Sequence, residues 1–337
     1  MKIGIIGGGL IGQERLQAIE YITKNIDNNI KLLCVFDSNK DVLEKIKQKY
    51  NIPTVSFIDE MWLLKPDWVF ICTPHDMIKP LIKLAFQNGT NILVEKPLGK
   101  SLEECNEIIS CKPDNLKLHV GFNYRFFAGV EALLKDCSEN KFGKLISVNM
   151  TLAHGNAPGM EKSWKLDPIK CGGGCLIDPG VHLLDLILNM SSGNVSVENV
   201  KSWSGFWNTG IEEETHLLLS DSNGTIFNTQ ISLNRWRSTF KLEINGTEGY
   251  GIVEGRGRSY GNQSYRTGVR WGWQSGKSQI DSENIVVENY NCVDSFIKET
   301  ISVLNLSDCN STSKACDYNE AKNVMSLLNE CQQKINK

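Results

Sequence analysis

The sequence predicts an α/β domain with a parallel sheet, followed by an α+β domain with a large, mostly antiparallel open sheet. The first prediction rests on a glycine-rich turn near the N-terminus and on strands that alternate with helices to about residue 122. The second rests on β-branched and apolar runs that begin at Leu145. We therefore expect two domains, residues 1–122 and 123–337, and leave open that the final helix packs back on the first.

The composition is that of a soluble globular protein. The chain has 337 residues, of which 41% are hydrophobic and 22% charged, and its formal net charge is -3. A slightly acidic chain has no general attraction for nucleic acid or anionic membranes, and the sequence contains no run of ~18 apolar residues that would cross a bilayer. We expect a cytoplasmic protein with no nucleic-acid or membrane partner.

The 11 cysteines are scattered without a Cys-x-x-Cys pair, which favours reduced thiols. Cys171, Cys175 and His182 are near one another in the sequence and could be considered as metal ligands. Because no fourth ligand has a suitable spacing, no metal site is expected.

The segment KIGIIGGGLIG near the N-terminus has the pattern of a dinucleotide-binding turn. Gly7, Gly9 and Gly12 match G-x-G-x-x-G between a predicted strand and a predicted helix. The first glycine makes the turn, the second lets a pyrophosphate approach the backbone, and the third allows close packing of helix on strand. The helix N-terminus, at Leu10 and Ile11, offers N–H groups to the phosphates.

An acid follows the second apolar run at the expected distance. Asp37 stands about where a carboxylate binds the ribose hydroxyls of NAD, with Ser38 beside it. No arginine follows that would bind a 2′-phosphate, so NAD is favoured over NADP, although Lys40 could change that preference. The alternative is a glycine-rich turn that binds nothing.

Polar residues also follow the later strands of the first half. Ligands of such sheets bind at the carboxyl ends of the strands, so these residues are expected to share one edge with the glycine turn. The further cofactor-binding candidates are Thr73, Pro74, His75, Glu95, Lys96 and Asn123.

The second half contains the stretch WKLDPIKCGGGCLIDPGVHLLDL, in which Asp178 and His182 are four residues apart. On a helix this spacing puts two side chains on one face. Pro179 is tolerated only in a first turn, so the helix should begin close to it. The structural alternative is that Asp178 caps the helix and His182 is hydrogen-bonded within the core.

Residues 255–280 form a basic segment. Arginines and aromatic residues are interleaved there without an acid. Guanidinium groups bind phosphate bidentately, so a loop, partly strand, that holds a nucleotide diphosphate is expected. A solvated loop or a subunit contact is the alternative. After it, residues 288–304 and 318–335 are predicted as amphipathic helices.

Several of these motifs together resemble the Gfo/Idh/MocA oxidoreductases, the glucose–fructose oxidoreductase and inositol dehydrogenase superfamily. The motifs are the glycine turn, Thr73-Pro74, Glu95-Lys96-Pro97, Gly121-Phe122-Asn123-Tyr124-Arg125, and three glycines followed by Asp-x-Gly-x-His. The resemblance covers essentially the whole chain except the basic segment. It implies an NAD-binding Rossmann domain, a lysine at position 96 that reaches cofactor and substrate before an often cis proline, His182 as general base, and Asp178 lining the same pocket.

The resemblance implies hydride transfer between nicotinamide and a secondary alcohol or ketone of a sugar-like substrate. Imidazole suits the proton step, and the Lys96 ammonium would stabilise a developing alkoxide. The basic segment favours a nucleotide-activated sugar over a free polyol. The expected substrate-binding residues are Lys96, Tyr124, Arg125, Trp164, Asp178, His182, Arg256, Arg258 and Arg266.

Three alternatives to this function remain open. They are an inositol-type polyol dehydrogenase, a glycosidase that uses NAD without net redox change, and a catalytically silent NAD-binding regulator. The open sheet leaves one face able to pair with another subunit, so a homodimer or homotetramer is expected.

Overall fold

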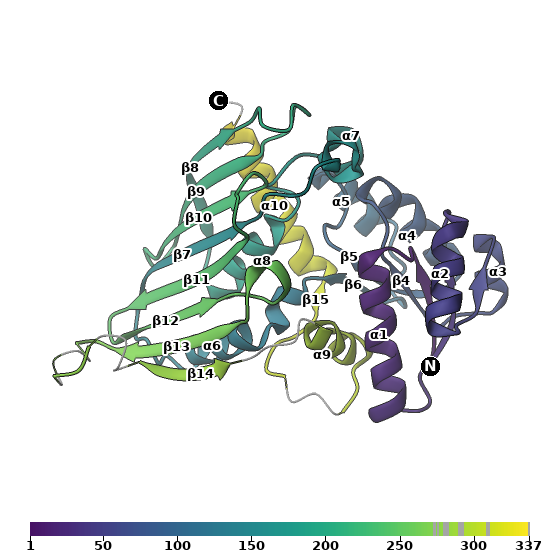
Figure 1. Ribbon diagram of the computed structural model, residues 1–337, viewed down its shortest axis with the longest axis horizontal. Helices are drawn as coiled ribbons and strands as arrows, with labels where there is room; N and C mark the ends of the chain where they lie inside the picture. Colours follow the sequence, from purple (N-terminus) through teal and green to yellow (C-terminus); the bar gives the residue numbers. More distant parts are fainter. Residues whose placement is uncertain (272–273, 275, 279–282, 289–292, 308–310, 336–337) are drawn as a thin grey trace. The chain divides into compact units, whose positions relative to one another are not determined.

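The computed structural model describes residues 1–271, 274, 276–278, 283–288, 293–307 and 311–335 (Figure 1). The chain divides into two compact units. The first contains Met1–Asn123 and Val293–Met325, and the second contains Tyr124–Cys292 and Ser326–Lys337. Within the described residues, no helix is both long and apolar enough to span a bilayer.

The first unit is built on a seven-stranded sheet in the order β15-β6-β5-β4-β1-β2-β3. All neighbouring strands are parallel except the β15–β6 pair. The central strand β4 is buried at all four residues, as a strand covered on both faces should be. The strands are β1 Lys2–Ile6, β2 Lys31–Phe36, β3 Thr54–Val55, β4 Trp68–Ile71, β5 Asn91–Glu95, β6 Leu118–Gly121 and β15 Cys316–Asp317.

Helices connect these strands, which confirms the parallel α/β architecture expected from the sequence. The helix Ile78–Gln87, for example, buries Ile78, Leu81, Ile82, Ala85 and Phe86 and contacts strands β4 and β5. The helices are α1 Leu10–Asn25, α2 Lys40–Tyr50, α3 Ile58–Leu63, α4 Ile78–Gln87, α5 Leu102–Ser110 and α9 Val293–Leu304, with the first turns of α10 Tyr318–Ile335.

The position of α9 differs from the prediction. Residues 293–317 were expected in the second domain but belong to the first unit, together with the first turns of the final helix, whose packing on the first domain was left open. The reason is the packing of α9 on α1, in which Phe296 and Ile301 share one core with Leu16 and Ile19. An amphipathic pattern shows which face of a helix is buried but does not identify the surface that covers it.

The second unit is built on an eight-stranded sheet in the order β14-β13-β12-β11-β7-β10-β9-β8, drawn as an open sheet in Figure 1. Only the described pair β7–β10 is parallel, so the expected large, mostly antiparallel sheet is confirmed. The strands are β7 Leu145–Ala153, β8 Val195–Trp203, β9 Glu214–Asp221, β10 Ile226–Ser232, β11 Thr239–Gly246, β12 Gly249–Glu254, β13 Ser264–Val269 and β14 Asn284–Glu288.

The strands of this sheet alternate between a buried and an exposed face. In β9, Leu217 and Leu219 are buried whereas His216 and Leu218 are exposed. Helix α6 packs against β12, β13 and β14, and also contacts α8. The helices of this unit are α6 Ala128–Ser138, α7 Pro168–Cys171, α8 Val181–Met190 and the end of α10.

One local prediction in this region needs correction. The helix expected over residues 288–304 begins at Val293, and Glu288 ends strand β14, because the β-branched run before it pairs with β13. The basic segment, residues 255–280, was expected to be a loop that is partly strand. The strand part is confirmed, because the segment contains β13 and a short 3-10 turn, η5 Arg258–Tyr260. Residues 272–273, 275 and 279–280 of that segment lie outside the described residues.

Candidate active site

The glycine turn of the first unit has the geometry that a bound dinucleotide needs. Gly7 has φ +97°, a backbone region that favours glycine. A Cβ on Gly12 would lie 1.9 Å from the Gly7 carbonyl oxygen, so the third glycine permits the close approach of α1 to the turn. A Cβ on Gly9 would meet nothing within 4 Å, which leaves the backbone at the helix N-terminus open. Leu10 begins α1 and is largely exposed, whereas Ile11 is partly buried against the core.

Asp37 is held at the mouth of this turn. Its Oδ2 accepts a hydrogen bond from the backbone N–H of Gly8 at 2.7 Å, and its Oδ1 accepts one from the N–H of Asn39 at 2.8 Å. These bonds fix the carboxylate beside the second glycine, where it can accept hydrogen bonds from ribose hydroxyls. Ser38 and Lys40 are exposed next to it.

Three of the predicted residues follow neighbouring parallel strands. Thr73 comes after β4, Lys96 after β5 and Asn123 after β6, and β5 pairs with both other strands. The Thr73 hydroxyl oxygen is buried and has no hydrogen-bond partner within the described residues, as expected for a group that awaits a ligand. The glycine turn, Asp37 and Thr73 therefore fit a dinucleotide.

Other predicted cofactor residues have partners within the protein. Asn123 donates from Nδ2 to the Ser295 hydroxyl of α9 at 3.1 Å, and it is buried. Pro74 precedes the short helix η1 His75–Met77, in which His75 is 2% exposed. The structure thus places both the Asn123 amide and the His75 imidazole in the interior of the first unit.

Glu95 belongs to a buried ionic cluster that the sequence did not reveal. Arg15 of α1 is fully buried and donates from Nε to Glu95 Oε1 at 2.8 Å. It also forms an ion pair of 2.6 Å with Glu299 of α9. These two carboxylates raise the pKa of Arg15 despite its burial. The cluster ties Glu95, which precedes Lys96 and the cis Lys96–Pro97 peptide, to helix α1.

The second unit brings the other predicted chemical residues together around His182. His182 lies in the first turn of α8 and is 5% exposed. Its imidazole stacks on the ring of Tyr124, with centroids 3.8 Å apart and planes inclined by 5°. Burial raises the pKa of the Tyr124 hydroxyl, so this ring stays neutral.

Asp178 is buried in this unit, but it does not lie on the same helix as His182, contrary to the prediction. Helix α8 begins at Val181 with Gly180 as its N-cap, and the Asp178–Pro179 peptide is cis. Asp178 therefore precedes the helix and is neither its cap nor part of a helical four-residue pair. Its carboxylate is buried and forms an ion pair with Lys165, at 2.9 Å between Nζ and Oδ2.

Two residues near Asp178 were missed by the sequence analysis. Lys165 follows the predicted Trp164 in the 3-10 turn η4 Trp164–Leu166, and its Nζ lies 5.5 Å from the Trp164 ring centroid. His154 follows β7, and burial lowers its pKa to about 4, with Asp178, Lys165 and Arg256 all acting on it. The position of Lys165 next to Trp164 in the sequence could have indicated Lys165. No sequence signal indicated His154.

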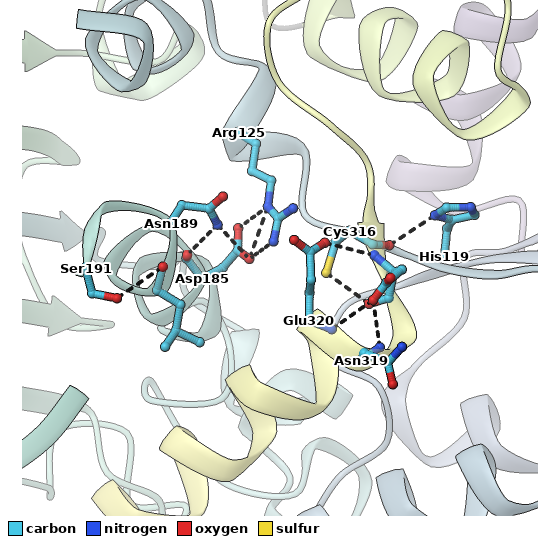
Figure 2. Close-up of polar contacts among 10 residues, drawn as sticks. His119, Arg125, Asp185, Asn189, Ser191, Cys316, Asn319 and Glu320 are labelled. Atoms are coloured by element: carbon cyan, nitrogen blue, oxygen red, sulfur yellow. Dashed lines mark hydrogen bonds and ion pairs between the residues drawn. The ribbon is translucent and has the colours of Figure 1, made fainter. Parts of the chain in front are cut away.

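The predicted arginines have different surroundings. Arg125 and Asp185 form a buried ion pair, with distances of 2.6 to 3.2 Å, and the Asn189 amide donates to the Asp185 carbonyl oxygen (Figure 2). Arg266 pairs with Glu254 at 2.5 Å and with Glu283 at 3.3 Å. Their charges are thus balanced within the second unit.

Arg256 and Arg258 come from the turn after β12. The Arg256 guanidinium lies 3.8 Å from the Tyr260 ring centroid and 5.3 Å from that of Tyr124. Arg258 is exposed and has φ +53°. The Tyr124 ring therefore lies close to both Arg256 and His182.

Comparison with known protein families decides the class of this fold. Residues 1–122 match the model of the GFO/IDH/MocA oxidoreductase family with its NAD-binding Rossmann fold. Residues 131–251 match the GFO/IDH/MocA C-terminal domain. The chain belongs to the Gfo/Idh/MocA family. This membership confirms the resemblance inferred from the motifs, and it makes the chain an oxidoreductase whose cofactor is NAD.

Relatives of this Gfo/Idh/MocA protein include sugar dehydrogenases. Glucose-6-phosphate 3-dehydrogenase of Bacillus subtilis is 26% identical over 224 residues, which cover 65% of this chain and 62% of that enzyme. Levoglucosan dehydrogenase, solved with NADH and levoglucosan, has a TM-score of 0.84 at 18% identity over 100% of this chain and 97% of that one. The WlbA dehydrogenase of Bordetella pertussis, solved with NADH and UDP-GlcNAcA, has a TM-score of 0.78 at 16% identity over 100% and 97%.

Proposed function

We propose that the protein interconverts a secondary alcohol and a ketone on a sugar-like substrate, with NAD as the hydride carrier. The observation that carries this proposal is the buried His182 imidazole stacked on Tyr124 in the unit that also holds Asp178. Dehydrogenation of an alcohol needs a base for the hydroxyl proton, and a neutral imidazole is suited to that step. The sugar dehydrogenases among the relatives support the substrate class.

Each residue of the proposed catalytic set has its own task. His182 accepts the hydroxyl proton during oxidation and returns it during reduction. Asp178, paired with Lys165, accepts a hydrogen bond from a substrate hydroxyl and orients the sugar ring. Lys96 stabilises negative charge on the substrate oxygen. Bound NAD supplies the redox chemistry, as the hydride acceptor or donor.

The cofactor set and the finer substrate class are proposals as well. Gly7, Gly9, Gly12 and Asp37 hold the dinucleotide through the backbone of the turn and the carboxylate fixed on Gly8. The stacked Arg256 supports a nucleotide-activated sugar, and the WlbA relative was solved with such a molecule. We further propose a cytoplasmic homo-oligomer that pairs through the exposed face of the large sheet.

The test is NADH formation at 340 nm by the purified protein with nucleotide-linked sugars, free sugars and free polyols. We expect turnover of sugar-type alcohols, and loss of most of the rate in His182→Asn, roughly 100-fold or more. His216→Asn is the matched control, because His216 is an exposed histidine of the same unit.

Each competing function predicts a different result. Full turnover by His182→Asn would remove the assignment of the base. Turnover of free polyols alone would remove the nucleotide-sugar proposal. Cleavage of a glycoside with NAD tightly held and no NADH released would show the enzyme without net redox, and NAD binding with no reaction would show a regulator.

A further inference from the structure

Two cations of the second unit lie next to the residues proposed for catalysis. Lys165 contacts Asp178 through its ammonium at 2.9 Å, and the Lys165 side chain is 48% exposed whereas that of Asp178 is 6% exposed. The attraction of this carboxylate raises the pKa of Lys165, so its ammonium stays charged at neutral pH. A buried carboxylate thus holds the ammonium of a lysine whose side chain is half-exposed.

Arg256 lies over the same aromatic ring that stacks on His182. Its guanidinium faces Tyr260 at 3.8 Å and Tyr124 at 5.3 Å, while Tyr124 stacks on His182 at 3.8 Å. Stacking occupies the flat face of a guanidinium, and its N–H donors lie in the plane at the edge. Such an arrangement presents a rigid fork of the kind that binds phosphate or carboxylate oxygens.

His154 shows that these charges act on one place. Asp178 raises the pKa of His154, whereas both Lys165 and Arg256 lower it, so the charges of all three groups reach this imidazole. Burial keeps His154 neutral at neutral pH. Two cations and one anion therefore lie near enough to this neutral imidazole for their charges to act on it.

We propose that Lys165 and Arg256 form an anion subsite, so that the sugar-like substrate carries a negatively charged group beside the ring that reacts. The shared chemistry is a phosphate or carboxylate oxygen, on a sugar phosphate, a sugar acid or a nucleotide-linked sugar. This inference rests on the proposed function, because it places the subsite next to Asp178 and His182. The inference goes beyond the proposed function by requiring a charged substrate and by naming Lys165 as a residue that binds its negative group.

The experiment compares equilibrium binding with turnover. Calorimetry on the protein saturated with NADH measures binding of glucose 6-phosphate, glucuronate, UDP-glucose and neutral glucose. The variants are Lys165→Gln, Arg256→Gln and the control Lys170→Gln, which removes an exposed lysine of the same stretch paired only weakly with Asp167. Circular dichroism checks that each variant is folded.

We expect at least one anionic ligand to bind more tightly than glucose, and each subsite variant to reduce that preference roughly 10- to 100-fold, the usual worth of a charge-assisted hydrogen bond. Lys170→Gln should leave the preference unchanged. The anionic ligand whose preferential binding is lost in the variants identifies the source of the negative group. Raising the salt concentration should weaken the same preference.

The outcomes separate the two proposals. Equal binding of all four ligands, or an anionic preference that survives both substitutions, would overturn the subsite even if NADH is formed from neutral sugars. A charge preference that depends on Lys165 and Arg256, without NADH formation from any sugar, would keep the subsite and overturn the proposed redox function.

Discussion

The aromatic ring of Tyr124 and the imidazole of His182 lie face to face, 3.8 Å apart and inclined by only 5°. Tyr124 is 4% exposed and comes from the 3-10 turn η2 Asn123–Phe126, whereas His182 comes from α8. The stack therefore sets the plane of the proposed base through a segment distant in the sequence. Positioning of this kind matters because small displacements of a catalytic group lower rates strongly.

Replacing Tyr124 tests this positioning. Tyr124→Leu should lower kcat roughly 10- to 100-fold and remove the ring-current shift of the His182 ring signals in NMR spectra. Tyr124→Phe keeps the aromatic ring and should keep both the rate and the shift, because the Tyr124 hydroxyl stays protonated. An equal loss of rate in both variants would show that the hydroxyl, and not the stack, is what matters.

Two substitutions in the glycine turn distinguish its effect on NAD binding from its effect on the stability of the fold. Gly9→Ala adds a methyl group where nothing lies within 4 Å, so the protein without NAD should lose at most about 1 kcal/mol of stability while its Kd for NAD rises roughly 10-fold or more. Gly12→Ala places a Cβ 1.9 Å from the Gly7 carbonyl oxygen and should cost about 3 kcal/mol even without NAD. Urea unfolding and fluorescence titration measure the two effects. Unchanged NAD affinity in Gly9→Ala would argue against this turn as the phosphate site.

The buried pair of Arg125 and Asp185 should behave as a structural unit. Arg125→Met or Asp185→Leu alone leaves one buried charge without its partner and should cost about 3–5 kcal/mol. The double variant should cost much less than the sum, as measured by urea unfolding. Lys135→Gln is the control, because its pair with Glu139 is exposed and should contribute less than about 1 kcal/mol. Additive losses would show that the two residues do not stabilise each other.

His154 should make stability depend on pH. Its pKa is about 4 in the folded protein and about 6.5 in an unfolded chain, so between these values the unfolded state binds more protons. The free energy of unfolding should therefore fall as the pH drops from about 6.5 to 4, by on the order of 2 kcal/mol once the partial exposure of the ring is considered. Urea unfolding of the wild type and of His154→Gln at a series of pH values measures this. Identical slopes for both proteins would contradict the burial of a neutral imidazole.

Much of the fold followed from local patterns. The turn at Gly7, Gly9 and Gly12 and the buried strands after it predicted a parallel sheet with NAD as cofactor, and both are confirmed. Backbone requirements of this kind involve residues that are adjacent in the chain, so the sequence expresses them directly. The same holds for the alternation that predicted the large open sheet.

Contacts between distant segments could not be inferred in this way. Nothing in the pattern of α9 shows that Glu299 meets Arg15, that Asp185 neutralises Arg125, or that Lys165 holds Asp178. Ionic partners are chosen by the packing of whole elements, and a lysine or glutamate has the same local pattern on a surface as in a cluster. Local chemistry in the chain was therefore enough to name the fold, the cofactor and the candidate residues. Their actual partners depended on how the helices and sheets pack, because burial, which gives a charge its influence, exists only once the chain has folded.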